Sequence, residues 1–266
     1  MAIHPTAIVD PSARIGSDVD LGPHAVIGPE VALGDGCRIG PHVVIVSHTR
    51  LGDRCMVHAH AVLGDTPQDL AFRGAVSWVE IGADVTIREG VTINRGTKEG
   101  TVTQVGDGCF LMANSHLAHN VALGRRVILA NGALLAGYVE VADAAFISGN
   151  AVVHQFCRVG RLAMIAGGAV ITKDVPPFCT THSDHRNTVA GLNIVGMRRA
   201  GLGSEDRLHV KRAFGLLYRG GLTPAQAADR IDAELPEGPA RELSAFLRGG
   251  TRGVCSFVGG GSDDAG

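Results

Sequence analysis

The chain has 266 residues and a formal net charge of −2, so it has no overall positive field that would attract nucleic acid or an anionic membrane surface. Hydrophobic residues make up 45% of the chain but aromatic residues only 4%, with 37 glycines, which favours thin, regular layers over a bulky globular core. No apolar run is long enough to span a bilayer, and the N-terminus lacks the basic and apolar regions of a signal peptide, so we expect a cytoplasmic protein without membrane insertion.

A repeat of six residues begins at Ile3 and dominates the first two thirds of the chain. Each hexapeptide has one aliphatic residue, followed four positions later by a small or β-branched residue such as Ala13 or Val19. A helix predicts a period of 3.6 and a two-sided strand a period of 2, and neither gives six. The repeat therefore predicts a left-handed parallel β-helix over residues 1–177, in which each hexapeptide is a short strand and a tight turn, with Gly, Asn and Asp relieving the turns. The aliphatic positions are Ile3, Val9, Ile15, Leu21, Ile27, Leu33, Ile39, Ile45, Leu51, Val57, Leu63, Ile81, Ile87, Ile93, Val105, Leu111, Leu117, Leu123, Leu129, Leu135, Val141, Ile147, Val153, Val159, Ile165 and Ile171.

Two gaps, near 65–80 and 97–104, interrupt the repeat without changing its phase. We expect both segments to be loops expelled from a continuous prism, where loops commonly carry binding residues. Four of the six cysteines share the small-residue phase and none forms a CxxC pair, so we expect reduced packing cysteines rather than disulfides or a metal site.

His116 and His119 flank the core position Leu117 and lie off the core phase. Two outward histidines three residues apart suit a general base and a substrate contact, or simply a pair of solvated or interface histidines. A zinc site would need a third histidine, for example His154, as in β-helix hydratases. His154 and Gln155 lie about two turns further along the prism, so a ligand stretched along it would contact both places.

After Val175-Pro176-Pro177 the repeat stops. We expect a connecting segment at 178–201, a small C-terminal α-helical domain at 202–256 and a disordered tail at 257–266. Ser204 is a candidate N-cap of the first helix, Thr223-Pro224 begins a second, and a third covers about 239–248.

Basic residues mark the start of this C-terminal part. Arg198 and Arg199 suit a pyrophosphate or an acidic partner. The first helix carries basic residues that would receive an acidic carrier protein: Arg207, Lys211, Arg212 and Arg219. Prisms of this kind usually associate side by side, so we expect a trimer with active sites at subunit boundaries.

The sequence resembles the UDP-N-acetylglucosamine 3-O-acyltransferase family, the first acyltransferases of lipid A synthesis. The matching stretches are Gln68–Leu70, Ile87–Thr97, His116–His119, Val153–Cys157, Asp174–Pro177, Asn193–Gly196 and Gly250–Gly253. The resemblance implies a homotrimer that transfers an (R)-3-hydroxyacyl group from acyl carrier protein to the 3-hydroxyl of UDP-N-acetylglucosamine. It implies no metal and no organic cofactor beyond the phosphopantetheine of the carrier.

The resemblance also assigns roles to individual residues. His119 falls on the general base, and Gly137 on the glycine whose N–H stabilises the oxyanion. Gly167 falls on a position that limits the acyl-chain length. The positions expected around the substrate are Asp69, His116, Asn120, Tyr138, His154, Gln155, Asn193, Arg198 and Arg199.

Several positions depart from the family pattern. Asn120 stands where the family usually has Asp, Tyr138 and Asn94 each replace a His, Ala71 replaces a Lys and Ala200 an Arg. These changes leave open the alternative that the acceptor is an amine. That amine would be a 3-amino UDP-sugar or the acceptor of the pathway's N-acyltransferase. The N-acyltransferase typically carries the sequence Ala-His-Asn at this place but has an extra N-terminal domain. A zinc hydratase and a non-catalytic β-helix are the remaining alternatives.

Overall fold

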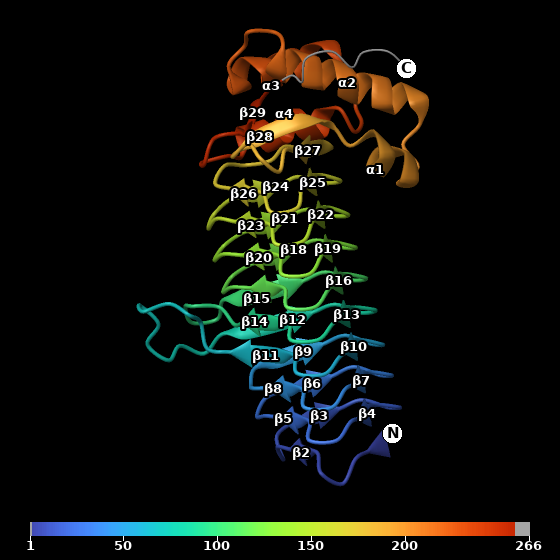
Figure 1. Cartoon of the computed structure of the whole chain (residues 1–266), viewed down its shortest axis with the longest axis vertical. Coiled ribbons are helices and arrows are strands. Elements are labelled where there is room, and N and C mark those ends of the chain that lie inside the picture. The colour runs from blue at the N-terminus through green and yellow to red at the C-terminus, as the bar shows by residue number, and fades with distance from the viewer. Residues whose placement is uncertain (1, 259–266) are drawn as a thin grey trace.

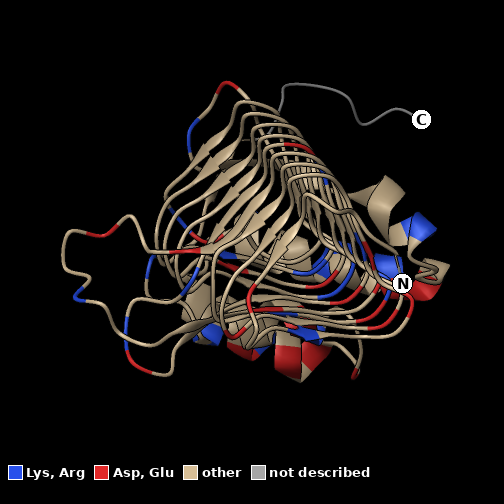
Figure 2. Cartoon of the chain, turned by 90° about the horizontal axis from the view of Figure 1, so that it is seen from below, with Lys and Arg blue, Asp and Glu red and all other residues tan. Residues whose placement is uncertain are grey.

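The structure is a computed structural model that describes residues 2–258, and it forms a long triangular prism with helices packed at one end (Figure 1). The prism is a left-handed parallel β-helix, so the predicted fold class is confirmed. Viewed along the prism, the stacked coils have a triangular outline from which loops project (Figure 2).

Three sheets form the faces of the prism, with parallel pairing throughout except for one antiparallel pair near the C-terminal end. The 12-stranded sheet contains β1 (Ala2–Ile3), β4 (Asp20–Leu21), β7 (Arg38–Ile39), β10 (Met56–Val57), β13 (Thr86–Ile87), β16 (Phe110–Leu111), β19 (Ile128–Leu129), β22 (Phe146–Ile147), β25 (Met164–Ile165), β27 (Cys179–Thr181), β28 (Thr188–Leu192) and β29 (Ser256–Phe257). The 9-stranded sheet contains β2 (Ile8–Val9), β5 (Val26–Ile27), β8 (Val44–Ile45), β11 (Val62–Asp65), β14 (Thr92–Asn94), β17 (His116–Leu117), β20 (Leu134–Leu135), β23 (Val152–Val153) and β26 (Val170–Ile171). The 8-stranded sheet contains β3 (Arg14–Ile15), β6 (Ala32–Leu33), β9 (Thr49–Leu51), β12 (Trp78–Ile81), β15 (Val102–Val105), β18 (Ala122–Leu123), β21 (Glu140–Val141) and β24 (Arg158–Val159).

The aliphatic position of each hexapeptide points into the prism and stacks on its equivalent in the next coil. Ile3 pairs with Leu21, and Leu21 in turn with Ile39. These side chains are buried from Leu21 to Ile171, whereas Ile3, in the first described strand, is 45% exposed. All six cysteines are free and buried, and burial raises the pKa of the Cys109 thiol to about 11. The Cys109 thiol therefore packs as a small neutral side chain.

The turns use more residue types than we predicted. In most hexapeptides the third residue after the core position has a left-handed backbone, which Gly, Asn and Asp adopt most easily. Here His, Arg, Tyr, Phe and Leu also adopt it, as at Tyr138 and Phe156, so the prediction of Gly, Asn and Asp was too narrow. The glycines that directly follow the core position serve coil stacking instead: a Cβ on Gly28 would lie 1.9 Å from the Val46 carbonyl oxygen.

Two loops leave the prism at the same edge, at 66–77 and at 95–101, and project beside β11 and β14 (Figure 1). The loops support each other, since Ser77 Oγ donates to the Gly96 carbonyl at 2.6 Å and the Val76 N–H donates to Glu99 Oε2 at 2.9 Å. Both loops end earlier than we predicted, because the strands that follow them, β12 and β15, are four residues long and begin at Trp78 and Val102.

The C-terminal part caps the prism with α1 (Ile194–Arg199), α2 (Ser204–Tyr218), α3 (Pro224–Glu234) and α4 (Arg241–Arg248). Thr223 is the N-cap of α3, as predicted, and the structure adds a capping box with Gln226. Gly203, not Ser204, is the N-cap of α2, since the chain turns helical one residue earlier than expected. The predicted connecting segment contains β27, β28 and α1. In the predicted disordered tail, Phe257 lies in β29, and residues 259–266 lie outside the described part of the chain.

Within residues 2–258, no helix has both the length and the apolar character needed to cross a membrane.

Candidate active site

His119, Asn120, Gly137 and Tyr138 lie together at the prism edge between the 9-stranded and the 8-stranded sheet, which we call the His119 edge. His119 follows β17, and Gly137 takes the same position after β20, one coil further along. The two expelled loops leave this edge after β11 and β14. The repeat therefore stacks the predicted catalytic residues directly beside the loops.

The hydrogen bonds of Asn120 define which nitrogen of His119 carries a proton. The backbone N–H of Thr97 donates to Asn120 Oδ1 at 3.1 Å, and a backbone N–H can only donate, so this atom is the amide oxygen. His119 Nδ1 lies 3.1 Å from the same oxygen and must therefore be the protonated nitrogen. In the neutral imidazole, Nε2 then has a free lone pair, as a general base requires.

Gly137 lies against the imidazole ring of His119. A Cβ on Gly137 would be 2.3 Å from Cε1 and 2.6 Å from Nε2 of that ring, so only glycine fits beside the histidine. No hydrogen bond within residues 2–258 uses the Gly137 N–H. At the edge that follows the 8-stranded sheet, by contrast, an aspartate of the next coil accepts from the equivalent N–H, as Asp143 does from Arg125.

The other side chains at this edge are aromatic or hydroxylated. The ring of Tyr138 stacks on Phe156 at 5.0 Å and meets the ring of His119 edge-on at 5.3 Å. Tyr138 Oη lies 2.9 Å from Thr97 Oγ1.

His116 points outward from the 9-stranded sheet, and its Nδ1 lies 2.7 Å from Thr92 Oγ1. Burial lowers the pKa of His116, so this imidazole is neutral near pH 7. A neutral ring hydrogen-bonded through Nδ1 offers Nε2 to a ligand.

His154 and Gln155 are exposed after β23, and Gln155 takes the position that follows Gly137 along the edge. Arg252 Nη2 lies 3.1 Å from His154 Nδ1, and the Gln155 carbonyl oxygen lies 3.3 Å from the same nitrogen. The C-terminal segment thus brings the Arg252 guanidinium close to the His119 edge.

Asp69 lies in the first loop, where its carboxylate accepts from the Ala71 N–H at 2.8 Å. No hydrogen bond among residues 2–258 links Asp69 to His119. Its side chain thus stabilises a turn of the loop.

The remaining predicted residues lie on other edges of the same chain. Gly167 lies between the 12-stranded and the 9-stranded sheet. Asn193 and Arg199 line a cavity of about 980 Å³ beside the third edge, which we call the Arg126 edge because Arg126 lies there between the 8-stranded and the 12-stranded sheet. One chain therefore does not bring the predicted residues into a single site.

This cavity combines an apolar wall with cations. Ile128, Phe146 and Met164 form the wall on the outer face of the 12-stranded sheet. Within residues 2–258, Arg126 and Arg199 form no ion pair, whereas Arg161 makes a bidentate pair with Glu242 at 2.7 Å. Unpaired guanidiniums over an apolar wall suit a phosphorylated ligand.

Asn193 supports this cavity through the backbone. Its Oδ1 accepts from the Gly196 N–H at 2.8 Å and caps α1, while its Nδ2 donates to the Leu162 carbonyl at 2.8 Å. Arg198, by contrast, is exposed in the last turn of α1 and does not line the cavity.

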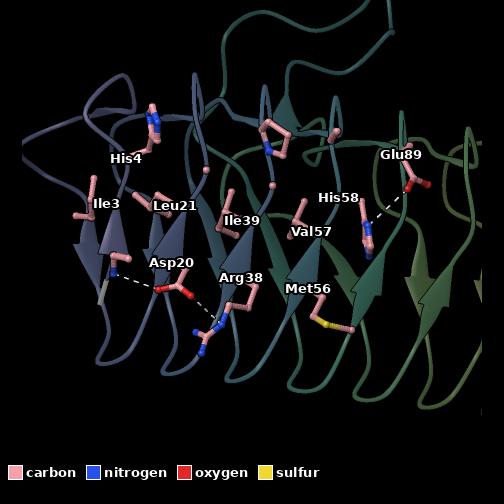
Figure 3. A pocket seen from close by; sticks show the side chains of 15 residues that line it. Ile3, His4, Asp20, Leu21, Arg38, Ile39, Met56, Val57, His58 and Glu89 are labelled. Carbon is pink, nitrogen blue, oxygen red and sulfur yellow. Dashed lines mark hydrogen bonds and ion pairs between the residues drawn. The ribbon is translucent and has the colours of Figure 1, made fainter.

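A groove of about 630 Å³ crosses the first coils, and none of the predicted site residues lines it (Figure 3). Asp20 pairs there with Arg38 at 3.1 Å, and His58 Nδ1 lies 3.5 Å from Glu89 Oε1. Among residues 2–258, no cluster of three or more His, Cys, Asp or Glu side chains is arranged to hold a metal ion.

Sequence inspection missed three residues that the structure brings to the His119 edge, to His154 and to the cavity beside the Arg126 edge. Thr97 contacts Asn120, Arg252 contacts His154, and Arg126 lines the cavity. Thr97 and Arg252 belong to stretches that carry the family resemblance, but neither has a periodic position that would have indicated its contact.

Curated relatives and solved structures match nearly the whole chain, and family models match parts of it. The family model for UDP N-acetylglucosamine O-acyltransferase, domain 2, matches residues 174–255, and the bacterial transferase hexapeptide model matches residues 103–137. The acyl-(acyl-carrier-protein)–UDP-N-acetylglucosamine O-acyltransferase of Alkalilimnicola ehrlichii is 47% identical over 254 residues, which cover 95% of this chain and 98% of the relative. Its counterpart in Janthinobacterium sp. is 42% identical over 258 residues, with 95% and 98% covered.

Solved structures give the same result. The structure of LpxA from Acinetobacter baumannii superposes with a TM-score of 0.92 at 38% identity and covers 96% of this chain and 99% of its own. The UDP-N-acetylglucosamine acyltransferase from Campylobacter jejuni has a TM-score of 0.90 at 34% identity, with 96% and 100% covered.

Proposed function

The chain belongs to the acyl-(acyl-carrier-protein)–UDP-N-acetylglucosamine O-acyltransferase family. From that membership we propose that it transfers an (R)-3-hydroxyacyl group from acyl carrier protein to the 3-hydroxyl of UDP-N-acetylglucosamine. This transfer is the first step of lipid A biosynthesis. The observation that carries this proposal is the His119 edge: an imidazole with its proton on Nδ1 beside the unused N–H of Gly137. A base and an oxyanion donor side by side suit acyl transfer.

The reaction begins with attack of the sugar hydroxyl on the thioester carbonyl. His119 Nε2 takes the hydroxyl proton as the oxygen forms its bond to the carbonyl carbon. The carbonyl oxygen becomes an oxyanion, and the Gly137 N–H donates to it. The Nδ1–H bond to Asn120 keeps the imidazole in its base form before attack and holds the imidazolium afterwards.

The tetrahedral intermediate then collapses. The carbon–sulfur bond breaks, the electron pair leaves with the phosphopantetheine sulfur, and the proton on His119 Nε2 passes to that sulfur. The products are the 3-O-acyl sugar nucleotide and the free thiol of the carrier, so the cycle needs no metal or organic cofactor of its own.

The outer faces of the sheets support a homotrimer. The 9-stranded sheet exposes aliphatic side chains, with Ile8 at 65%, Leu134 at 41% and Val170 at 37%. The 12-stranded sheet presents charged Asp20 and Arg38 in its first coils and apolar Met56, Phe110, Ile128, Phe146 and Met164 further along, whereas the 8-stranded sheet presents Arg14, Arg50, Glu80, Glu140 and Arg158. Apolar faces favour burial between subunits, and the charged face favours solvent.

Packing the 9-stranded face of one subunit on the 12-stranded face of the next completes the site. The edge between these two sheets then faces the threefold axis, and the His119 edge of one subunit meets the Arg126 edge of its neighbour. The neighbour's Arg126 and Arg199 receive the diphosphate, while Arg198 contributes positive charge nearby. His116, Asn120, Tyr138, His154, Gln155 and Asp69 surround the sugar and the acyl group from the first subunit.

The acyl chain lies between the two apolar faces, and Gly167 leaves room at its far end because it has no side chain. The carrier protein docks on the basic side of α2, where Lys211 and Arg212 are exposed and, among residues 2–258, form no ion pair. Opposite charge steers such encounters.

The direct test offers a series of (R)-3-hydroxyacyl carrier thioesters with UDP-N-acetylglucosamine or its 3-amino analogue and identifies the products by mass. We expect an O-acyl product that His119→Ala lowers by orders of magnitude while the trimer is retained. Transfer to the amine alone would replace the proposed acceptor, and transfer to neither would refute the proposal. Full activity of His119→Ala would remove the role of His119 as base.

A further inference from the structure

We infer that the second expelled loop, through Thr97, is a positioning device that keeps the oxygen of the Asn120 amide turned toward His119. This inference rests on the proposed role of His119 as base. An amide side chain has one acceptor end and one donor end of nearly equal size, so its orientation needs an external cause.

Thr97 supplies two donors to the same atom. Its backbone N–H lies 3.1 Å and its Oγ1 lies 3.0 Å from Asn120 Oδ1. If the amide were reversed, its NH₂ group would meet the Thr97 N–H donor to donor, which desolvates both without a bond. The native orientation is thus fixed by the loop and not by the histidine.

Tyr138 completes the chain of donors. Thr97 Oγ1 donates its proton to Asn120 Oδ1, so it has lone pairs free to accept from the Tyr138 hydroxyl at 2.9 Å. The donors then run in one direction, from Tyr138 to Thr97 to Asn120, and His119 Nδ1–H reaches the same oxygen from the other side. Such chains strengthen each member.

The backbone of this region is held independently of these side chains. Thr103 Oγ1 accepts from the Asn120 N–H at 2.7 Å, and Asn120 has the left-handed backbone of the turn, with φ 60°. On the loop, the Gly96 carbonyl accepts from buried Ser77 at 2.6 Å. Removing the Thr97 hydroxyl therefore leaves both backbones in place.

A reversed amide would disable the base. Its NH₂ would donate to His119 Nδ1, which would have to become the unprotonated nitrogen, and the ring proton would move to Nε2. A protonated Nε2 cannot accept the proton of the sugar hydroxyl. The wrong tautomer is costly in enzymes that use a histidine base, as the aspartate-to-asparagine change in serine proteases shows.

This explanation makes Thr97 necessary only because residue 120 is an amide. A carboxylate has two equivalent oxygens and no wrong orientation, so it needs no such device. The decisive experiment is therefore a cycle of Thr97→Val, Asn120→Asp and the double variant, with Thr97→Ser as the conservative control. In the Asn120 background, Thr97→Val should lower kcat/KM about five- to tenfold, the loss expected for one hydrogen bond, and Thr97→Ser should restore it.

In the Asn120→Asp background, Thr97→Val should change kcat/KM by less than about twofold, because nothing remains to be oriented. Equal losses in both backgrounds would mean that Thr97 acts only through packing and would overturn the inference. Wild-type activity of Thr97→Val would overturn it as well. Trimer mass and melting temperature of each variant check that the fold is retained.

A second readout is independent of turnover. In ¹⁵N-histidine-labelled protein, the His119 signals, assigned by comparison with His119→Ala, should show a protonated Nδ1 and an unprotonated Nε2. Thr97→Val should shift these signals toward the other tautomer, and Asn120→Asp should reverse that shift. An Nε2–H tautomer in the wild-type protein would refute the positioning role. If the wild-type protein transfers no acyl group, the proposed function fails, whereas this measurement still decides the role of Thr97.

Discussion

At the scale of single residues, the contact of Gly137 with the imidazole of His119 allows no added side chain. Gly137→Ala would place a Cβ 2.3 Å from Cε1, so the ring must move away from its bond to Asn120. We expect kcat to fall by about a hundredfold or more, because displacing a catalytic group by an ångström has that effect. Steady-state transfer assays test this.

The matched control is Gly191→Ala, where a Cβ meets no atom within 4 Å. It should keep nearly the full rate. If Gly137→Ala retained activity like this control, the close fit between glycine and imidazole would have no part in catalysis.

His116 gives the protein a pH-dependent stability. Burial lowers the pKa of His116, and burial together with the Arg95 charge lowers that of His48. The unfolded chain therefore binds protons at these groups at a higher pH than the folded chain does. Stability is fully present above the unfolded pKa of about 6.5 and is lost as the pH falls through the lower, folded pKa values.

Replacing His116 by Gln should flatten this dependence between about pH 7 and pH 5. Urea unfolding at several pH values measures the slope. A slope equal to that of the wild-type protein would show that His116 does not contribute to it.

At the scale of elements, the end of the prism is closed by a buried ion pair. Asp174 is fully buried and binds Arg158 at 2.9 Å, and its Oδ1 also accepts from the Arg158 N–H. Arg158 in turn donates to the Phe246 carbonyl at 2.8 Å, which ties α4 to the last coil. Because the β-helix ends here, this pair replaces the next coil.

Asp174→Ala should lower the free energy of unfolding by about 3 kcal/mol or more, since it leaves the Arg158 charge without its partner. Asp229→Ala removes the exposed partner of Arg248 and should cost less than about 1 kcal/mol. Chemical denaturation of both variants compares them. A similar small loss for Asp174→Ala would mean that water or another group compensates Arg158.

The same scale shows what the sequence can and cannot predict. The six-residue phase predicted every inward side chain from Leu21 to Ile171, because one repeated pattern dictates one repeated coil. It did not predict β27, β28 and α1, which occur once and have no period. His119 could be predicted as a site residue from its off-core position and the family resemblance. The contact of Thr97 with Asn120 could not be predicted, because it depends on how an expelled loop returns to the prism.

At the scale of the whole molecule, the faces of the prism predict how subunits meet. Leu134 is 41% exposed on the 9-stranded sheet, so Leu134→Glu would bury a charge in the proposed interface. Light scattering should show the wild-type protein as a trimer of the 27.6 kDa chain, and Leu134→Glu as a smaller or unstable assembly. Glu140→Lys on the 8-stranded sheet should leave the trimer intact. A stable trimer in Leu134→Glu would place the interface elsewhere.

A site shared between subunits makes a further prediction that a site within one chain does not. His119 lies on one edge of the prism and Arg199 on the cavity beside another, so in the proposed trimer each active site would take His119 from one subunit and Arg199 from its neighbour. His119→Ala and Arg199→Ala should each be nearly inactive alone. Co-expressed at equal levels, they should recover about a quarter of the wild-type activity, because one interface in four then joins an intact His119 to an intact Arg199.

If both residues served one site within a single chain, every chain of the mixture would lack one of them and no activity would return. Mixing the separately purified homotrimers without subunit exchange is the control and should also remain inactive. Recovery only after co-expression thus separates a shared site from incomplete inactivation of either variant, and it links the apolar faces of the prism directly to catalysis.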